Sequence, residues 1–365
     1  MPFGVTWEAS TASAFWIQSW HRPFPIVRVP FDTATGRFSG PGDTALMTST
    51  GGFDASEDDG SLVYADGTAE YGLWALNLAD ALKGHFPSAP RLPAGTSPVT
   101  CSLSPDGTRL LLLRTVTSGG REGRDIVLLP FQGGAALAHW LVDSLLDDVS
   151  VQWMPDGRSF SYAERAPGGV LLVTVDVRSG LRHTAREIPD RYAQAFMPLS
   201  GGGWAWWSGS ERREHIQPGD AREAAPLPAL EDEVFSGVGV REAPSHNAVA
   251  SYAWPATYDT LFVDVTALPR GPTIRWAAFG SPLWSLAGFG IWWLGDGSLI
   301  AWLQEKEGQS VLYRVKGPGR VERLGVIPRS LAGFSMTPDG RRVAMVTRDF
   351  RGDIWLAHLR RTGGP

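Results

Sequence analysis

Short apolar runs alternate with turn-forming residues along most of the chain, and one kind of turn recurs with the same flanks. Its full form is a Pro-Asp-Gly turn followed closely by an apolar run, found at residues 104–107 before 110–113, 154–157 before 160–163 and 337–340 before 343–346. Proline fixes φ at the first corner, aspartate can hydrogen-bond its own backbone and glycine accepts a positive φ. The runs are too short for stable helices and lie between helix breakers, so they predict strands joined as hairpins.

Weaker copies extend this pattern over the whole chain. Residues 58–60 and 295–297 keep the Asp-Gly part of the turn, while residues 200–203 and 245–247 have lost the signature. A second apolar run follows most turns after about 15 residues, and these runs are 71–78, 125–131, 170–177, 259–265, 310–315 and 353–359. With a similar layout in the first 40 residues, the chain divides into eight units averaging about 46 residues.

Each unit predicts four strands, and a period of 40 to 50 residues with four strands per unit is typical of a β-propeller. We therefore expect an all-β fold, a β-propeller of four-stranded blades that forms a single domain over residues 1–365. Eight blades are expected, with seven as the alternative if the fifth or the N-terminal unit forms no sheet of its own. Residues 209–233 are expected to be an irregular excursion that replaces strands of the fifth unit.

The repeated turn, the hydrophobic run and the Asp-Ile-Val-Leu or Asp-Ile-Trp-Leu sequence after it resemble the TolB-like, WD-repeat-related β-propeller family. The resemblance covers almost the whole chain; it is strong over residues 104–131 and 337–359 and poor over 201–240. Similar blades form the propellers of dipeptidyl peptidase IV relatives and of some bacterial Ser/Thr kinases. The resemblance implies the architecture and no particular function, because propellers serve as hydrolases, receptors and scaffolds alike.

Ring closure needs a further strand, because the last unit ends before its outer strand. Residues 3–7 contain Val5, Thr6 and Trp7, which are good strand formers. We expect this N-terminal strand to pair with residues 353–359 and to fasten the first blade to the last.

The composition supports a turn-rich β fold and excludes several classes of protein. The chain has 43 Gly and 27 Pro among 365 residues, which is too many breakers for a helical bundle, and 43 % hydrophobic residues, which is too many for a disordered chain. Its net charge is −5 without a long basic patch, so nucleic acid is not expected as a partner. Cys101 is the single cysteine, which excludes an internal disulfide and a thiolate zinc site.

No transmembrane segment is expected. Residues 276–295 carry no charge, but their glycines and Pro282 favour a turn between two strands over a membrane helix. The first 20 residues do not show the pattern of a secretory signal. We expect the protein in the cytoplasm or peripherally on the cytoplasmic face of a membrane, or in the periplasm if a signal peptide has been removed.

The motifs of common active sites are missing from the sequence. It contains no P-loop, no dinucleotide-binding Gly motif after a strand, no His-Glu-x-x-His and no nucleophile elbow, and its seven histidines are never paired at ligand spacing. We therefore assign no catalytic residue, no cofactor and no metal ligand. The aspartates of the Pro-Asp-Gly turns are interpreted as structural.

Three groups of residues are candidates for binding a partner. The N-terminal aromatic residues suit an interface, the polar stretch 115–124 suits a flexible loop, and the charged stretch in residues 209–233 breaks the repeat. The candidate partner-binding residues are Trp7, Trp16, Trp20, Arg121, Arg124, Arg212, Arg213 and His215.

The functional hypothesis is a non-enzymatic scaffold or extrinsic subunit that binds other protein subunits in a larger assembly. A membrane-bound energy-transducing or photosynthetic complex is one example. One alternative is a hydrolase or lyase with a site at the channel mouth, since residues drawn from several blades leave no local motif. Another is a ligand-sensing module of a larger signalling chain.

Overall fold

The computed structural model describes residues 2–7, 14–19, 24–48, 53–55, 61–92, 97–118, 121–142, 151–211, 213–219, 223–228, 235–236, 241–254, 260–268, 271–280, 289–306 and 309–358. The chain forms two compact units, a larger one of Tyr71–Arg348 and a smaller one of Met1–Glu70 with Asp349–Pro365. Two long strands, β7 (Ser61–Asn77) and β30 (Arg342–His358), contribute residues to both units. The chain was expected to form one domain over residues 1–365.

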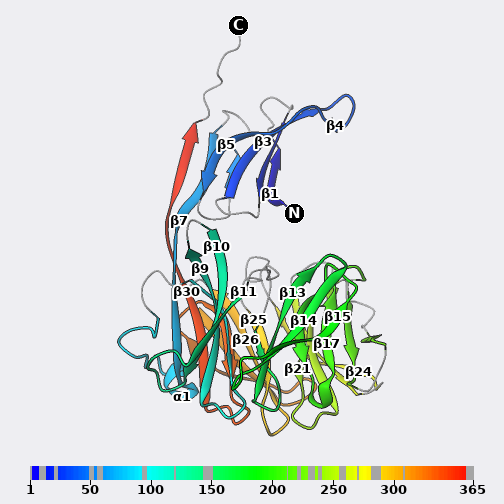
Figure 1. Ribbon diagram of the computed structural model, residues 1–365. Helices are drawn as coiled ribbons and strands as arrows, with labels where there is room; N and C mark the ends of the chain where they lie inside the picture. Colours follow the sequence, from blue (N-terminus) through cyan, green and yellow to red (C-terminus); the bar gives the residue numbers. More distant parts are fainter. Residues whose placement is uncertain are drawn as a thin grey trace. The chain divides into compact units, whose positions relative to one another are not determined.

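The larger unit contains five antiparallel sheets that follow one another along the chain (Figure 1). The first is β8 (Ser97–Leu103), β9 (Arg109–Ser118), β10 (Arg121–Pro130) and β11 (Ala138–Val142). The second is β12 (Gln152–Trp153), β13 (Ser159–Ala166), β14 (Gly169–Asp176) and β15 (Arg182–Ile188). The third is β16 (Gln194–Pro198), β17 (Trp204–Ser208), β18 (Arg213–Gln217) and β19 (Ala225–Pro226), with a 3₁₀ turn at Ser200–Gly202.

The fourth and fifth sheets complete the series. The fourth is β20 (Phe235–Ser236), β21 (Arg241–Glu242), β22 (Ala248–Trp254), β23 (Thr260–Ala267) and β24 (Thr273–Gly280). The fifth is β25 (Phe289–Trp293), β26 (Leu299–Lys306), β27 (Gln309–Val315) and β28 (Val321–Ile327).

A sixth sheet combines the two ends of the larger unit. Its order is β29 (Leu331–Met336), then β30, then β7, so a strand from early in the chain follows two from its end. In Figure 1 the blue β7 and the red β30 run side by side. The helix α1 (Leu78–Leu82) follows β7 directly.

Hydrophobic clusters join each of these six sheets to the next and the sixth to the first. Each cluster contains residues of neighbouring sheets: Leu113, Phe160 and Trp206; Ala205 and Val249; Val263 and Leu303; Ile300 and Met345; Val346 and Leu112. The described sheets of the larger unit therefore pack in a closed cycle. Because both faces of the middle strands are covered, the β9 run of Leu110 to Leu113 is fully buried on both faces.

The Pro-Asp-Gly segments form the tight hairpin turns that the sequence predicts. At the first of them, Gly107 adopts φ +68° and its N–H donates to the carbonyl of Ser104 at 2.8 Å. Asp106 accepts hydrogen bonds from the Ser104 hydroxyl at 2.6 Å and from the Thr108 N–H at 3.0 Å. The aspartate thus has the structural role that its place in the turn requires.

The smaller unit is built on a separate sheet. The strands β1 (Pro2–Trp7), β2 (Ala14–Ser19), β3 (Phe24–Asp32) and β4 (Arg37–Phe38) pair in that order, β5 (Asp43–Thr48) also pairs with β3, and β6 (Phe53–Ala55) pairs with β7. Its apolar cluster contains the fully buried side chains of Ile26 and Leu62. The exposed Phe38 and Met47 lie on its surface.

The predicted closure of the ring by residues 3–7 is not confirmed, because the described pairings do not join them to residues 353–359. Residues 3–7 lie in β1, which pairs with β2, while β30 lies between β29 and β7. In the sheet that contains β30, the next strand is β7. The count of eight blades is not confirmed, since the strands of the first sequence unit form the sheet of the smaller unit.

Two predicted loops contain strands. The stretch 115–124 continues β9 and β10, which pair as far as Ser118 and Arg121, with residues 119–120 outside the described part. The excursion 209–233 contains β18 and β19, the third and fourth strands of their sheet. The sequence analysis missed β18 because its charged residues suggested a solvent-exposed loop. Glu214 and His215 are nevertheless buried within this strand. Among the described residues, no helix has the length and apolar character needed to cross a membrane.

Candidate functional site

A cavity of about 200 Å³ lies where the six sheets of the larger unit converge. Every sheet contributes to its wall, and one lining residue from each is Cys101, Gln152, Phe196, Arg241, Trp292 and Ser335. Most of the lining residues come from β8, β12, β16, β21, β25 and β29, which are the strands that precede the hairpin turns. The cavity is therefore a product of the whole ring and belongs to no single sheet.

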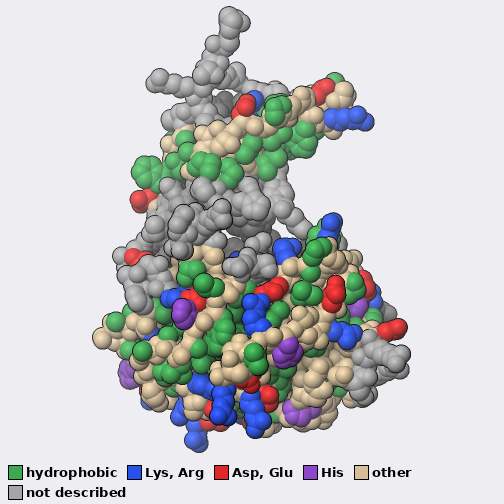
Figure 2. All heavy atoms as spheres, viewed as in Figure 1, with side chains coloured by type: hydrophobic (Ala, Val, Ile, Leu, Met, Phe, Trp, Pro, Cys, Tyr) green, Lys and Arg blue, Asp and Glu red, His purple; other side chains and the backbone are tan. Residues whose placement is uncertain are grey.

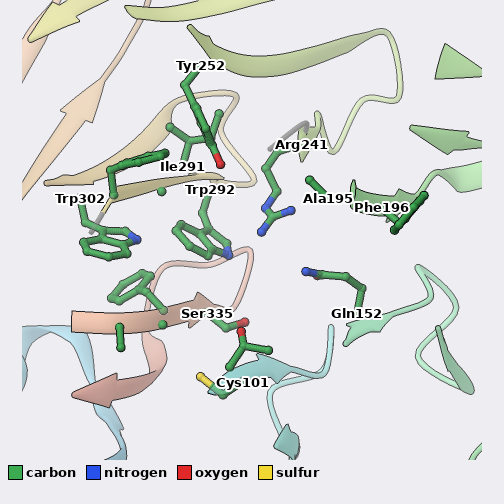
Figure 3. Close-up of a pocket in the computed structure, with 16 residues that line it drawn as sticks. Cys101, Gln152, Ala195, Phe196, Arg241, Tyr252, Ile291, Trp292, Trp302 and Ser335 are labelled. Atoms are coloured by element: carbon green, nitrogen blue, oxygen red, sulfur yellow. The ribbon is translucent and has the colours of Figure 1, made fainter. Parts of the chain in front are cut away.

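The repeat itself brings polar residues to this cavity. Gln152, Arg241 and Ser335 each stand three residues before the proline of a turn, namely Pro155, Pro244 and Pro338. These three residues lie on the inner strands of the second, fourth and sixth sheets. Figure 3 shows the side chains of Arg241 and Gln152 pointing toward a common space, which the Ser335 hydroxyl and the Trp292 indole also face.

Arg241 supplies positive charge to the cavity. Its backbone carbonyl accepts a hydrogen bond from Trp293 Nε1 at 2.8 Å, and its guanidinium carbon lies 5.2 Å from the centroid of the Trp292 ring. Burial lowers the pKa of the Arg241 guanidinium, because removal from water disfavours the charged form. Among the described residues that line the cavity, Arg241 is the one cation, and none is Asp or Glu.

An indole N–H in the wall has no hydrogen-bond partner among the described residues. Trp302 is 3 % exposed, and its Nε1 atom is buried without an acceptor. Gly290 makes room for this ring, because a Cβ atom at residue 290 would stand 2.6 Å from Trp302 Nε1 and 2.6 Å from Trp292 Cζ3. The absence of a side chain at Gly290 therefore lets the two indoles approach each other within the wall.

The other titratable groups of the lining hold their protons. Burial raises the pKa of the Cys101 thiol to about 12. The pKa of Tyr252 is also raised, first by burial and further by the nearby Glu214 carboxylate, against the opposing effect of Arg241. Within the described ranges, no three His, Cys, Asp or Glu side chains come together as a metal site would need.

The likeness to known proteins lies in the structure. No protein-family model matches the sequence, and no curated protein matches it. The putative TolB from Agrobacterium tumefaciens superposes with a TM-score of 0.51 at 13 % identity, covering 78 % of this chain and 99 % of that one. The fold is a TolB-like β-propeller.

Other propellers are similar at lower scores. TolB from Acinetobacter baumannii has a TM-score of 0.49 at 10 % identity and covers 92 % of this chain and 79 % of its own. A catalytically inactive variant of virginiamycin B lyase from Staphylococcus aureus, solved with quinupristin, has a TM-score of 0.42 at 12 % identity. The match covers 76 % of this chain and 99 % of the lyase chain. At such identities the likeness concerns the fold alone.

The predicted partner-binding residues are divided between the two units of this TolB-like propeller chain. Trp7 and Trp16 lie in the paired strands β1 and β2 of the smaller unit, whereas Arg121 and Arg124 lie in β10. The side chains of Trp7, Trp16 and Arg121, and the whole of Trp20 and Arg212, lie outside the described residues. The structure thus does not bring the candidates together as one site.

Two of the candidates lie on β18. Arg213 is exposed, whereas His215 is buried and stacks on Trp206 with ring centroids 5.6 Å apart. His215 Nε2 also lies 3.2 Å from Glu211 Oε2. His215 is therefore part of the packing between strands, and its assignment to partner binding stays a prediction.

The residues of the cavity were missed by sequence reasoning. The predicted binding residues lie at breaks in the repeat or near the N-terminus, whereas the cavity residues Gln152, Arg241, Trp292 and Trp302 lie in strands beside the hairpin turns. The sequence did contain a signal for two of these residues, because Gln152 and Arg241 each stand three residues before the proline of a turn. Comparing that position across units would have found part of the wall, but the approach of Trp302 depends on the fold.

Proposed function

We propose that this protein is a non-enzymatic binding subunit that receives a part of a partner protein in its channel cavity. The observation that carries the proposal is the convergence of six sheets on a cavity with inward-facing hydrogen-bonding groups among aromatic rings. Hydrogen-bonding groups that converge on one cavity are typical of ligand sites. The volume of about 200 Å³ lies below the roughly 300–1,000 Å³ of sites for drug-sized ligands, so it suits one group of a larger partner.

The protonation of the lining supports binding over catalysis. A general base has to accept a proton near neutral pH, and the raised pKa values of Cys101 and Tyr252 keep both groups protonated. The proposed role is that of an interaction module within a larger assembly. The hydrolase or lyase alternative ranks second for this reason.

The charges on the visible face of the larger unit also favour recognition at the cavity. Figure 2 shows Lys or Arg and Asp or Glu side chains interspersed over the visible face of the larger unit. Charges of both signs mixed in this way give little net field to steer a partner. The visible face therefore offers no single-sign patch that competes with the cavity for recognition.

Selection of peptides from a phage-displayed library on the immobilised full chain tests the proposal. Ala332 lines the cavity and is exposed, so Ala332→Trp should obstruct the opening, while Ala332→Ser is the matched control. We expect enriched peptides that bind the wild type and the Ala332→Ser variant and lose at least tenfold in affinity for Ala332→Trp. A failure to enrich any peptide, or peptides that bind both variants equally, would contradict the proposal.

A further inference from the structure

We propose that the channel cavity binds a neutral primary amide, which Gln152, Thr100 and Ser335 recognise together with backbone groups of the bulged inner strands. This inference rests on the proposed use of the cavity for binding and names the chemistry of the group that enters it. The amide can belong to an amide side chain of a partner or to a small free molecule, and the experiment separates these sources.

The first argument is the set of neutral polar side chains that faces the cavity. Gln152 carries both donors and an acceptor, and Figure 3 shows it pointing into the same space as the Ser335 hydroxyl. Thr100 adds a second hydroxyl to the wall. Among the described residues, the side chains of Gln152 and Thr100 have no hydrogen-bond partner. Ser335 Oγ accepts from the Leu103 N–H at 2.8 Å, which leaves its own proton to donate.

The second argument comes from the backbone of the inner strands, which lie at the edges of their sheets in the described pairings. Three of these strands, β8, β16 and β29, contain a β-bulge in the described registers. In β8 the extra residue is Val99, between the paired Pro98 and Thr100, and in β29 it is Ala332. Both extra residues stand six residues before a turn proline. A bulge leaves its extra residue outside the ladder, so backbone donors and acceptors remain beside the cavity.

The bulge of β16 contains a strained residue. Its register shifts between Gln194 and Met197, and the intervening Ala195 and Phe196 both line the cavity. Ala195 has φ +53°, a left-handed conformation that residues with a Cβ atom adopt at a cost in free energy. Backbone strain of this kind is concentrated at functional sites, where the surrounding structure maintains it. The position of Ala195 in the wall is therefore an independent indication of a binding site.

The groups of the wall match an amide better than a charged or an apolar group. A primary amide has two N–H donors and a carbonyl acceptor, so it can exchange two hydrogen bonds with Gln152 at once. A carboxylate has no donor for the Gln152 carbonyl and would bring a charge into the cavity. Because the lining is more polar than apolar, an apolar group would leave its donors and acceptors unpaired. Arg241 is not counted among the binding groups, because it already interacts with Trp292 and Tyr252.

Binding is tested on the full chain by titration with four probes. Three are tripeptides blocked at both ends, with a central glutamine, glutamate or leucine between alanines, and propionamide represents a free amide. The readout is the side-chain NH₂ resonance pair of Gln152 in a ¹⁵N spectrum, assigned by its loss in Gln152→Met. We expect the glutamine peptide to shift this pair and to bind at least tenfold more tightly than the other two peptides. A side chain is the source if the glutamine peptide binds more tightly than propionamide, and a free molecule is the source if propionamide binds more tightly.

Variants separate the contacts, with affinities measured by calorimetry. Gln152→Met and Thr100→Val remove hydrogen-bonding groups at similar side-chain volume, and each should weaken amide binding about threefold to tenfold. Gln194→Met is the matched control and should change affinity less than about twofold. Gln194 is half-buried like Gln152 and lies on the inner strand β16, but it does not line the cavity. If Gln152→Met does not fold, Thr100→Val and the leucine peptide still decide the question.

The amide site would be overturned if the leucine or glutamate peptide binds as tightly as the glutamine peptide, if the Gln152 resonance pair does not move, or if Gln194→Met causes an equal loss. Selected peptides that keep their affinity after every Asn and Gln is replaced would leave the proposed function standing and refute only this inference. Propionamide that shifts the Gln152 pair when no displayed peptide is enriched would support the amide site and refute the proposed function.

Discussion

The two units use nearly the same short sequence with opposite burial. Asp125 to Leu128 reads Asp-Ile-Val-Leu in the larger unit, and its four side chains are at most 5 % exposed. Asp353 to Leu356 reads Asp-Ile-Trp-Leu in the smaller unit, where Trp355 is 51 % and Leu356 57 % exposed. The sequences favour a strand in both places, but burial depends on whether a neighbouring sheet covers it.

The turns differ less between the units, because in each a threonine hydroxyl donates to an aspartate and a glycine has a positive φ, although Thr337 precedes its aspartate by two residues and Thr35 follows its aspartate by three. In the larger unit the Thr337 hydroxyl donates to Asp339 at 2.5 Å, and in the smaller unit the Thr35 hydroxyl donates to Asp32 at 2.8 Å. These hydrogen bonds are the largest of several causes that lower the pKa of both carboxyl groups. Gly340 and Gly36 adopt φ of +70° and +66°. Turn geometry is thus local, whereas the burial of a strand is a tertiary property.

The largest expected effect comes from truncating the same leucine of the two copies. Leu128→Ala should lower the free energy of unfolding by about 2–5 kcal/mol, because it opens a cavity in a covered sheet. Leu356→Ala should change it by less than about 0.5 kcal/mol, because the side chain is already exposed. Urea denaturation followed by circular dichroism measures both, and equal losses would contradict the comparison.

The second-largest difference in stability is expected from the aspartates of the two Asp-Ile-x-Leu copies. Asp125 is buried and accepts hydrogen bonds from Arg114, with the closest contact at 2.6 Å, whereas Asp353 is exposed. Asp125→Asn should cost about 1–3 kcal/mol, since it weakens a charged hydrogen bond in a buried place. Asp353→Asn should be nearly neutral, and thermal melts at pH 7 provide the check. A neutral Asp125→Asn would show that the pair contributes little.

A smaller effect is expected where two hairpin turns of the ring meet. Arg342 Nη1 donates to the Gly107 carbonyl at 2.9 Å, and Arg109 donates to the Gly157 carbonyl at 2.8 Å, so an arginine links each turn to the next sheet. Arg342→Ala should destabilise the larger unit by about 1 kcal/mol. The control is Arg341→Ala at the neighbouring position, which should leave the unfolding midpoint almost unchanged. Equal shifts in the two variants would argue against a specific link.

The smallest effect concerns pH and should be the same in both units. Thr337→Val should raise the pKa of Asp339, and Thr35→Val that of Asp32, toward the ordinary 3.8. Because the folded pKa is lowered, each turn adds stability above pH 3.8 and loses it as pH falls through the folded value. Carboxyl ¹³C titration measures the shifts. A shift in one unit only would show that the turns are not equivalent.

Much of the fold could be predicted from the repeated pattern. The Pro-Asp-Gly turns and the strands that flank them lie where the sequence predicts them, as at β9 after Gly107 and β13 after Gly157. The stretch 276–295 contains the end of β24 and the whole of β25, with 281–288 outside the described residues. Sequence reasoning failed for the long strands, because no local signal says that β7 and β30 continue past one hairpin.

The candidate site could be predicted only in part. The repeat places Gln152 and Arg241 at equivalent positions, since strand period and turn position are local properties. The approach of Trp302, Trp292 and Gly290 brings together residues of different strands, and no spacing along the chain encodes it.

The sequence by itself determined the turns, the strands and the all-β class, because φ preferences, Asp–backbone hydrogen bonds and apolar alternation act within a few residues. Tertiary structure decided that β7 lies beside β30, which copy of the Asp-Ile-x-Leu sequence is buried, and which residues line the cavity with Arg241. These outcomes depend on contacts between segments distant in the chain, such as Trp74 with Thr347. Apolar burial is non-directional, so the pattern demands a covering surface without specifying which segment supplies it.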